Sequence, residues 1–157
     1  MHPTSVRFVE EAAAQYGLDV DVHEFPEGTK TAADAAEAIG CDVAQIASSL
    51  VFVADGQPVV VVTSGANRVS EDRLADALGA GSVRMAEPDE VKEATGWSIG
   101  GVPPFCHETD VPVLLDRTLL DHETVWAAAG TPDAVWPADP EALVEIADAQ
   151  VADVAES

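Results

Sequence analysis

The sequence predicts an α/β fold in which one domain, residues 1–157, holds a mixed β-sheet surrounded by helices. Three observations support this prediction. Asp55 and Gly56 form a tight-turn pair between two apolar, β-branched runs, which is typical of a β-hairpin. Several short segments have helical periodicity and begin with a capping residue or end with glycine. Strands and helices do not alternate strictly, which favours a mixed sheet.

The N-terminal segment predicts a helix followed by a strand. The helix should end at Gly17, because glycine readily adopts the left-handed conformation of a helix end. Alternating apolar residues over 20–25 predict a short, half-buried strand, and Pro26–Gly28 predicts a turn. The residues that recur at helical spacing, and that we expect to face the core, are Val6, Val9, Ala13 and Tyr16.

A second helix and the hairpin follow. Thr31 is placed to cap an alanine-rich helix that ends at Gly40, and Asp42 to cap one further turn. The hairpin strands fall within 49–55 and 57–65. Both runs are nearly continuous in apolar residues, so we expect them to be buried on both faces of the sheet.

The middle of the chain predicts two more helices and a strand. A helix over 70–79 begins with serine and ends with glycine, a short strand covers 83–85, and a helix that begins at Glu-Pro covers 87–96. Residues 96–110 have neither helical nor strand periodicity, so we expect a long, ordered loop there.

The C-terminal part predicts strands over 111–116, 124–130 and 134–138, with a turn or short helix after the first of them. Asp139 and Pro140 begin a last helix, and we expect the tail, 151–157, to fray. The apolar face of this helix consists of Leu143, Ile146 and Ala147.

Charge is the most unusual property of the composition. The 157 residues include 29 acidic and 7 basic side chains, which gives a formal net charge of −22. Such an acidic, lysine-poor chain resembles proteins of extreme halophiles, in which concentrated salt screens self-repulsion; an unusually acidic mesophilic protein is the alternative. Hydrophobic residues make up 47%, which excludes a disordered acidic chain. No basic patch indicates nucleic-acid binding.

We expect a cytoplasmic domain without metal, cofactor or membrane contact. No apolar run approaches the ~18 residues of a membrane span, and the N-terminus lacks the pattern of a secretory signal. Cys41 and Cys106 are far apart, and neither belongs to a CxxC pair. The adjacent Cys106 and His107 lack the spacing of a helical metal-ligand pair, so we predict no zinc site.

The loop over 96–107 is the segment most informative about function. It contains three glycines and two prolines. Because Gly100 and Gly101 lack a Cβ, their backbone amides can approach a ligand and bind an anion or an oxyanion. The alternative is a rigid connector held in place by the side chains of Trp97, Ile99 and Phe105.

The order of several segments resembles the YbaK/prolyl-tRNA synthetase-associated domain family of aminoacyl-tRNA editing domains. The resemblance covers most of the chain and is most specific in TGWSIGGVPPFCH, residues 95–107. It implies one α/β domain, built around a mixed, barrel-like sheet, that hydrolyses the ester between a small mischarged amino acid and tRNA, usually a proline or cysteine tRNA. It also implies two partners, the 3′ end of aminoacyl-tRNA and an aminoacyl-tRNA synthetase. The other resembling segments are 31–40, 45–56, 68–79, 83–91 and 111–120.

The sequence departs from this family at two positions. Ser48 stands where the family usually has a lysine, and 128–131 reads Ala-Ala-Gly-Thr where many relatives have a Ser-Gly-Gly-Lys-type turn. Both changes remove polar or cationic groups from the substrate region. The primary hypothesis is a freestanding deacylase that edits aminoacyl-tRNA in trans. The alternative is a non-catalytic module of the same fold that binds tRNA or a small ligand.

The resemblance, together with the loop chemistry, gives three catalytic candidates: Gly100, Gly101 and Ser48. The two glycine amides would hold the ester carbonyl, and Ser48 would donate a neutral hydrogen bond in place of the family lysine. In the family's substrate-assisted mechanism, the free hydroxyl of the tRNA itself orients the attacking water. We therefore predict neither a covalent nucleophile nor a metal-bound water.

Six further residues are substrate-binding candidates: Thr31, Ser64, Ile99, Pro103, His107 and Asp116. Ile99 and Pro103, together with Val102, would limit the size of the amino acid. Structural alternatives remain for the others, because Thr31 is also placed to cap a helix, Asp116 to cap a turn, and His107 to lie exposed in its loop.

Overall fold

The computed structural model describes residues 2–25 and 31–156, so the turn expected at 26–28 lies outside the described residues. The described chain forms five α-helices, two 3₁₀ helices and eight strands. The strands are β1 (His23–Glu24), β2 (Ile46–Ala54), β3 (Gln57–Ser64), β4 (Val83–Met85), β5 (Val113–Asp116), β6 (Val125–Ala128), β7 (Ala134–Ala138) and β8 (Gln150–Ala152). The helices are α1 (Pro3–Tyr16), α2 (Ala32–Ile39), η1 (Val43–Gln45), α3 (Glu71–Leu78), α4 (Pro88–Thr95), η2 (Arg117–Asp121) and α5 (Pro140–Ala147).

The eight strands form one mixed sheet in the order β1-β7-β6-β2-β3-β5-β8, and β4 pairs with β2 outside this path. The β2–β6, β3–β5 and β5–β8 pairs are parallel, and the remaining pairs are antiparallel. The expected mixed sheet is therefore confirmed, but it is not closed into a barrel. Closure fails because β1 and β8 are the two outer strands and do not pair with each other.

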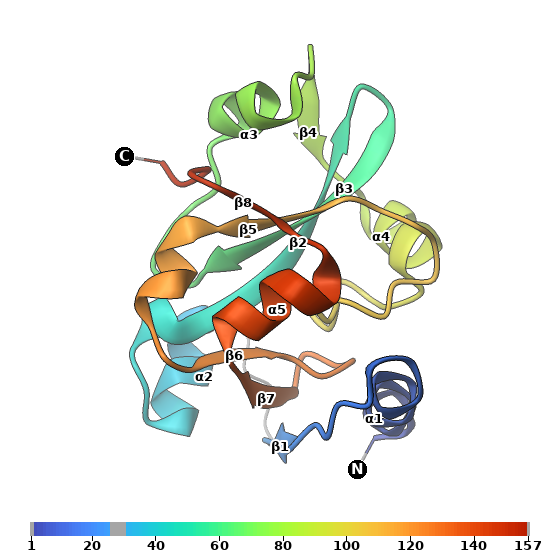
Figure 1. Ribbon diagram of the computed structural model, residues 1–157, viewed down its shortest axis with the longest axis vertical. Helices are drawn as coiled ribbons and strands as arrows, with labels where there is room; N and C mark the ends of the chain where they lie inside the picture. Colours follow the sequence, from blue (N-terminus) through green and yellow to red (C-terminus); the bar gives the residue numbers. More distant parts are fainter. Residues whose placement is uncertain (1, 26–30, 157) are drawn as a thin grey trace.

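The β2–β3 hairpin lies at the centre of the sheet and is buried on both faces, as its apolar runs predicted. On one face, side chains of the hairpin pack with Phe8 of α1, Val91 of α4 and Leu143 of α5. On the other face, they pack with Leu74 of α3. Figure 1 shows α5 lying across the front of the sheet, with α1 and α4 to its right and α3 at the top. Two packed layers of apolar side chains thus hold the central strands.

The predicted capping residues begin and end the helices. The Thr31 and Ser70 hydroxyls accept hydrogen bonds from backbone amides of the first turns of α2 and α3. Each of the expected glycines has a left-handed conformation at a helix end; these are Gly17, Gly40, Gly79 and Gly96. These signals are local in sequence, so the boundaries of the helices follow them closely.

The predicted buried face of α1 is wrong for Val6, Ala13 and Tyr16, whereas Val9 is half-buried and packs against the core. The helix buries Ser5, Phe8 and Ala12, whereas Val6 and Tyr16 are 38% and 42% exposed. The physical reason is the aromatic core: the Phe8 ring lies 5.5 Å from that of Phe105. Burying this ring turns the expected face of the helix toward solvent.

The ends of the chain also differ from the prediction. The strand expected over 20–25 is reduced to β1, because only His23 and Glu24 have partners on β7. The expected fraying after residue 150 is wrong for the described residues. β8 pairs with β5, Val154 is fully buried, and its carbonyl accepts the amide of Ser70 at 2.7 Å. The tail is held because it completes the second layer of the core.

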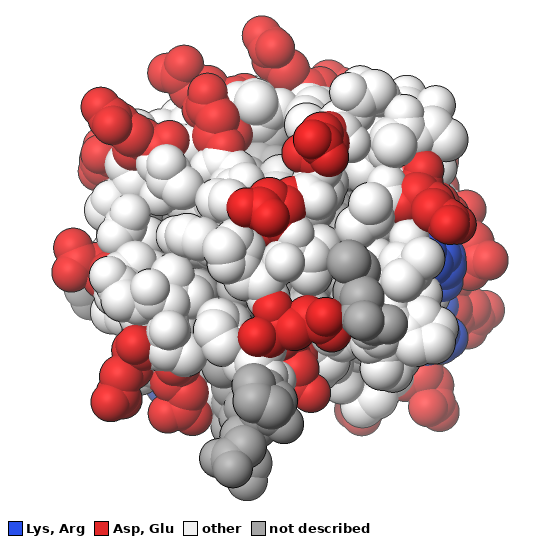
Figure 2. All heavy atoms as spheres, turned by 90° about the horizontal axis from the view of Figure 1, so that it is seen from below, with Lys and Arg blue, Asp and Glu red and all other residues white. Residues whose placement is uncertain are grey.

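Acidic side chains cover much of the surface. In Figure 2 they lie around and across a largely uncharged face, and cationic side chains show only at its margins. Among residues 2–25 and 31–156, no helix is long and apolar enough to cross a membrane.

Candidate active site

The sheet has an open edge in the middle of β2. On this side β2 pairs with β6 only at Ile46 and Ala47, and with β4 only from Phe52 to Ala54. Beyond Ala47 the two strands separate, and the carbonyl of Ala128 on β6 accepts the indole N–H of Trp136 at 3.2 Å. Within the described part of the chain, residues 48–51 therefore have no strand beside them on this edge.

A cavity of about 380 Å³ lies at this gap. Its walls come from the open edge of β2, the start of α2, the end of β4, the loop after α4, and the β6–β7 connection. Most of the lining is apolar, and the polar groups are few, as is usual for small-molecule sites. The lining residues that bring polar groups are Thr31, Ser48, Ser49 and Gly100, the last through its backbone.

The loop glycines do not act as a pair of free amides. The Gly101 amide donates to the Ser98 carbonyl at 3.0 Å, so the expected nest of two available donors is wrong at Gly101. The reason is a tight turn over 98–101, in which Gly100 has a φ of +86°. Such a turn uses its last amide and leaves its central amide free. Among the described residues, the Gly100 N–H has no hydrogen-bond partner, and Gly100 lines the cavity.

Gly101 is instead a site of close backbone packing. A Cβ on Gly101 would lie 2.7 Å from the Cα of Thr131 and 2.9 Å from the Gly130 carbonyl carbon. Gly130 is equally confined, since its own Cβ would lie 2.8 Å from the Thr4 carbonyl oxygen. These contacts hold the loop against the end of β6, and so fix the position of Gly100.

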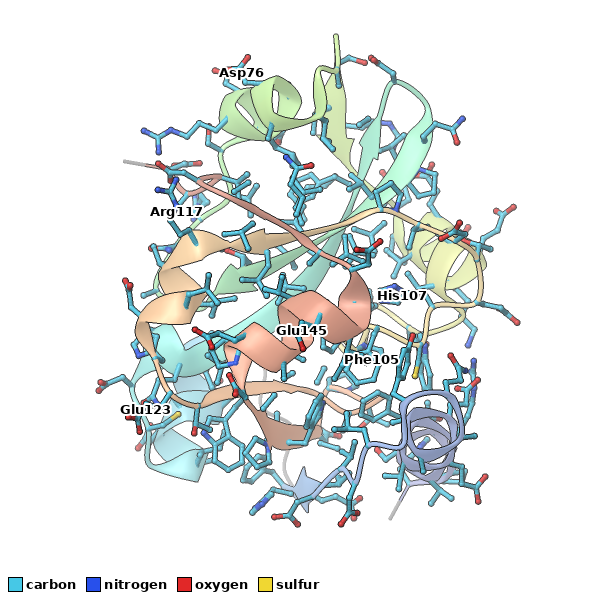
Figure 3. The ribbon with its side chains drawn as sticks, in the orientation of Figure 1. Asp76, Phe105, His107, Arg117, Glu123 and Glu145 are labelled. Atoms are coloured by element: carbon cyan, nitrogen blue, oxygen red, sulfur yellow. The ribbon has the colours of Figure 1, made fainter. Side chains whose placement is uncertain are left out.

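Hydrogen bonds within the loop and a cation–π contact hold its remainder in place. The Trp97 indole N–H donates to the Cys106 carbonyl at 2.9 Å, and the Arg7 guanidinium lies 4.0 Å from the centre of the Trp97 ring. His107 Nε2 lies 2.8 Å from the Pro103 carbonyl oxygen. Figure 3 shows Phe105 and His107 on the part of this loop beside α5. The loop is therefore a rigid connector that also presents Gly100 to the cavity.

Four of the predicted site residues lie together at the cavity: Thr31, Ser48, Ile99 and Gly100. Thr31 combines two roles, because its hydroxyl also accepts the Asp34 amide at 3.1 Å. Ser48 is half-buried on β2. Ile99 and Met85 line the cavity while each remains 52% exposed, so these two apolar side chains lie at its opening.

Asp116 and Ser64 lie outside the cavity lining, at the ends of β5 and β3. The Asp116 carboxylate is fully buried and accepts the Asn67 side-chain amide at 2.9 Å and the Thr118 amide at 3.0 Å. The Ser64 hydroxyl donates to the Ala44 carbonyl at 2.8 Å. Both side chains therefore join strand ends to neighbouring loops, and the turn-capping alternative describes Asp116.

Pro103 and His107 also lie outside this lining. His107 and Cys106 line a second hollow of about 300 Å³, beside Val113 and Ile146. Burial lowers the pKa of His107, and the contact with the Pro103 carbonyl opposes this in part. Burial, assisted by the charge of Glu11, raises the pKa of the Cys106 thiol to about 12, so this thiol stays protonated and is a poor nucleophile.

The sequence reasoning missed Ser49. This residue lines the cavity, is 8% exposed, and its hydroxyl has no hydrogen-bond partner among the described residues. The sequence signal that could have identified Ser49 is the pair of adjacent serines in an otherwise apolar strand. Within the same residues, no group of three or more His, Cys, Asp or Glu side chains is placed to hold a metal ion.

Known proteins resemble this chain in sequence, and a solved structure also resembles it in fold. YwhH, an uncharacterised protein of Bacillus subtilis, is 34% identical over 148 residues, which cover 94% of each chain. The proline–tRNA ligase of Acidithiobacillus ferrooxidans is 31% identical over 109 residues, which cover 69% of this chain but only 19% of the ligase. A crystal structure of a candidate trans-editing enzyme for prolyl-tRNA synthetase matches with a TM-score of 0.93 and 42% identity, covering 100% of this chain and 99% of the other.

The family model described as the aminoacyl-tRNA editing domain matches residues 26–146, which include β2, the loop after α4 and every described wall of the cavity. This match confirms the resemblance inferred from the residues. Because it spans well over half of the sequence, the chain belongs to the aminoacyl-tRNA editing domain family.

Proposed function

We propose that this protein is a freestanding aminoacyl-tRNA deacylase that hydrolyses the ester of a small mischarged amino acid in trans. The observation that carries the proposal is the position of Gly100. Among the described residues its amide has no hydrogen-bond partner, and Gly100, on the glycine-proline loop that resembles the family's, lines a mostly apolar cavity at the open edge of β2. The family match and the fold of the trans-editing candidate support the same reaction.

The proposed reaction depends little on reactive side chains. Water attacks the ester carbonyl carbon, and the electron pair of the C=O bond moves onto the carbonyl oxygen. The Gly100 N–H stabilises this oxyanion by donating a hydrogen bond from a fixed position, and loss of such a donor costs about 3–4 kcal/mol. Collapse then breaks the bond to the tRNA oxygen, which takes up a proton. The products are the free amino acid and deacylated tRNA.

Water activation is assigned to the substrate itself. In this proposal the free ribose hydroxyl next to the ester orients the water, as in the family's substrate-assisted mechanism. Ser48 donates a neutral hydrogen bond from the position where the family usually has a lysine. Because a hydroxyl carries no charge, its contribution is smaller than that of an ammonium group.

The cavity walls favour a small amino acid. Val51, Val91 and Val102 line the cavity with branched side chains and allow little adjustment. Each additional methylene on the substrate would cost about 1–3 kcal/mol. The ligase relative and the trans-editing candidate support a proline tRNA as the substrate and prolyl-tRNA synthetase as a partner. We propose the cytoplasm as the place of this activity.

The direct test is deacylation of tRNA mischarged with alanine, serine or cysteine. Proline and cysteine tRNAs should both be tried, from low to molar salt, because the net charge of −22 makes the folded state depend on ionic strength. Hydrolysis above the rate without protein supports the proposal. The absence of hydrolysis for every pair, with a protein shown to be folded, would overturn it.

One observation favours a second candidate, a non-catalytic module that binds the 3′ end of tRNA or a small ligand. Ser48 stands where the family usually has a lysine, and no described residue of the cavity lining is cationic. Ser48→Lys distinguishes the two functions. If the parent protein is inactive and the substitution creates activity, the binding module is favoured. If the parent is active and the substitution changes its rate little, the deacylase is favoured.

A further inference from the structure

The open edge of β2 exposes the main chain of one particular residue. Along a strand, the N–H and C=O groups of successive residues point to alternate edges. The Ile46 carbonyl accepts the Gly65 amide on the β3 side, whereas the Val51 carbonyl accepts the Ala86 amide on the opposite side. The β2–β3 register is unbroken from Ala47 to Ala54. The N–H and C=O of Ser49 therefore point to the open edge.

The gap in hydrogen bonding is one residue long. On this edge Ala47 pairs with Ala127 of β6, and Val51 binds Ala86 after the end of β4. Within the described part of the chain, Ser49 lies between them and has no strand beside it on this edge, although β3 pairs with it on the other. A strand edge of this kind is a template for another backbone. Its length leaves room for one amino-acid unit and excludes a longer peptide strand.

We infer that the Ser49 main chain binds the aminoacyl group of the substrate as though it were one residue of a neighbouring antiparallel strand. This inference rests on the proposed function and adds the means by which the substrate is recognised. An α-aminoacyl ester carries an ammonium donor and a carbonyl acceptor at the spacing of a strand residue. In an antiparallel pair, two facing residues exchange both hydrogen bonds. The ammonium would donate to the Ser49 carbonyl, and the Ser49 N–H would donate to the ester carbonyl.

This arrangement supplies the second oxyanion donor that Gly101 does not provide. Ser49 and Gly100 both line the cavity, and in this inference their amides bind the same carbonyl oxygen. It also makes the free α-amino group a requirement for recognition. Among residues 2–25 and 31–156, the cavity lining contains no carboxylate that could bind an ammonium group instead. The protein should therefore select α-amino esters over acyl esters of the same size.

The experiment compares alanyl and propanoyl esters of the same tRNA, which differ only in the α-amino group. Each enzymatic rate is divided by the uncatalysed rate, because the ammonium also activates the ester itself. We expect the rate enhancement to fall about 10- to 100-fold without the amino group, as is typical for loss of a charge-assisted hydrogen bond. Equal enhancements for the two esters would overturn the inference while leaving the proposed function intact.

A binding measurement keeps the two proposals separable if no ester is hydrolysed. The probes are adenosines that carry an alanyl or a propanoyl group on a 3′-amino group, so that a stable amide replaces the ester. Tighter binding of the alanyl compound by about 10-fold or more supports the inference without any catalysis. Equal affinities, or no binding of either compound, would contradict it.

A Ser49→Pro variant tests the main chain directly. Proline removes the N–H that points to the gap, and the β2–β3 ladder does not use that N–H. Both rates should fall in this variant, because the ester carbonyl that the N–H binds is common to the two esters, provided that circular dichroism shows the protein folded. The ratio between alanyl and propanoyl esters should be kept, because proline retains the carbonyl that binds the ammonium. The matched variant Ser48→Ala should also keep the ratio, since both main-chain groups of Ser49 remain. Unchanged rates in folded Ser49→Pro would count against the Ser49 N–H, and the two substrate comparisons stand whether or not this variant folds.

Discussion

Gly101 and Thr131 are in direct backbone contact, because a Cβ on Gly101 would lie 2.7 Å from the Cα of Thr131. This contact joins the loop after α4 to the end of β6 and leaves no room for a side chain. It therefore makes the position of Gly100 depend on a glycine at 101.

Gly101→Ala should lower the free energy of unfolding by about 1–3 kcal/mol, the usual cost of overpacking. It should also reduce deacylation, because the displaced loop moves the Gly100 amide, and Gly101→Val should abolish the activity. Urea unfolding and single-turnover rates measure the two effects. The control is Gly81→Ala, whose Cβ would meet only Asp55 Oδ1, at 3.5 Å. Wild-type stability and rate in Gly101→Ala would contradict the contact.

His107 should make stability depend on pH. Burial holds its pKa below the ordinary 6.5, so the folded protein keeps the ring neutral after the unfolded chain has taken up a proton. The stabilisation is thus complete above pH 6.5 and is lost as the pH falls through the folded-state pKa. The free energy of unfolding should be compared at about pH 7.5 and about pH 5.5. The drop between the two should be smaller in His107→Gln, and an identical drop would show that other groups cause it.

Asp116 should stabilise the folded protein. Asp116→Ala leaves the amide groups of Asn67 and Thr118 without their buried acceptor, so we expect unfolding to become easier by about 3 kcal/mol or more. Thermal or urea unfolding measures the loss. Asp153→Ala is the control, because Asp153 forms an exposed ion pair with Arg73 at 3.2 Å and should contribute less than about 1 kcal/mol. Similar losses in the two variants would contradict the role of burial.

The C-terminal tail should contribute to the core. Val154 is fully buried against the second face of the sheet, so Val154→Ala should lower the free energy of unfolding by about 1–3 kcal/mol. Val151 lies in the same tail and is 38% exposed, so Val151→Ala should cost much less. Denaturant unfolding of both variants tests the difference. If the tail were frayed, Val154→Ala and Val151→Ala would both have wild-type stability.

Salt should stabilise the folded protein. The acidic side chains behind the net charge of −22 repel one another within a compact chain. Salt weakens this repulsion, because the screening length shortens to about 3 Å at 1 M. The unfolding temperature should therefore rise from low salt to molar sodium chloride. An uncharged osmolyte such as sucrose, compared at equal osmolality, separates screening from exclusion effects. A flat response to sodium chloride would show that charge repulsion is unimportant for this fold.

Local signals in the sequence predicted the elements well, and non-local contacts account for the differences. Thr31 and Gly40 delimit a helix through bonds within a few residues, and Asp55 with Gly56 specifies a turn by backbone conformation alone. The face that α1 buries depends on Phe105, which is remote in sequence. The order of the tail likewise depends on β5. Neither contact can be recognised from the periodicity of the residues around it.

The candidate site could likewise be predicted only where it depends on local sequence. The glycine-proline loop identified Gly100 because its backbone freedom is a local property, and Thr31 and Ser48 lie beside it at the cavity. Asp116 and Ser64 are the last residues of β5 and β3, and neither of them lines the cavity. Ser49 became visible only with the neighbours of β2 in place. An open edge is defined by where β4 and β6 stop, and the sequence of β2 does not contain that information.

The outermost strands of the sheet also bear on how copies of the protein behave together. β1 has two residues and β8 has three, so each rim presents very few backbone groups to another molecule. Rims this short give a second copy almost nothing on which to extend the sheet. Crowded molecules therefore meet mainly through mutually repelling acidic surfaces, and the protein should resist stacking into fibres even when its concentration is high.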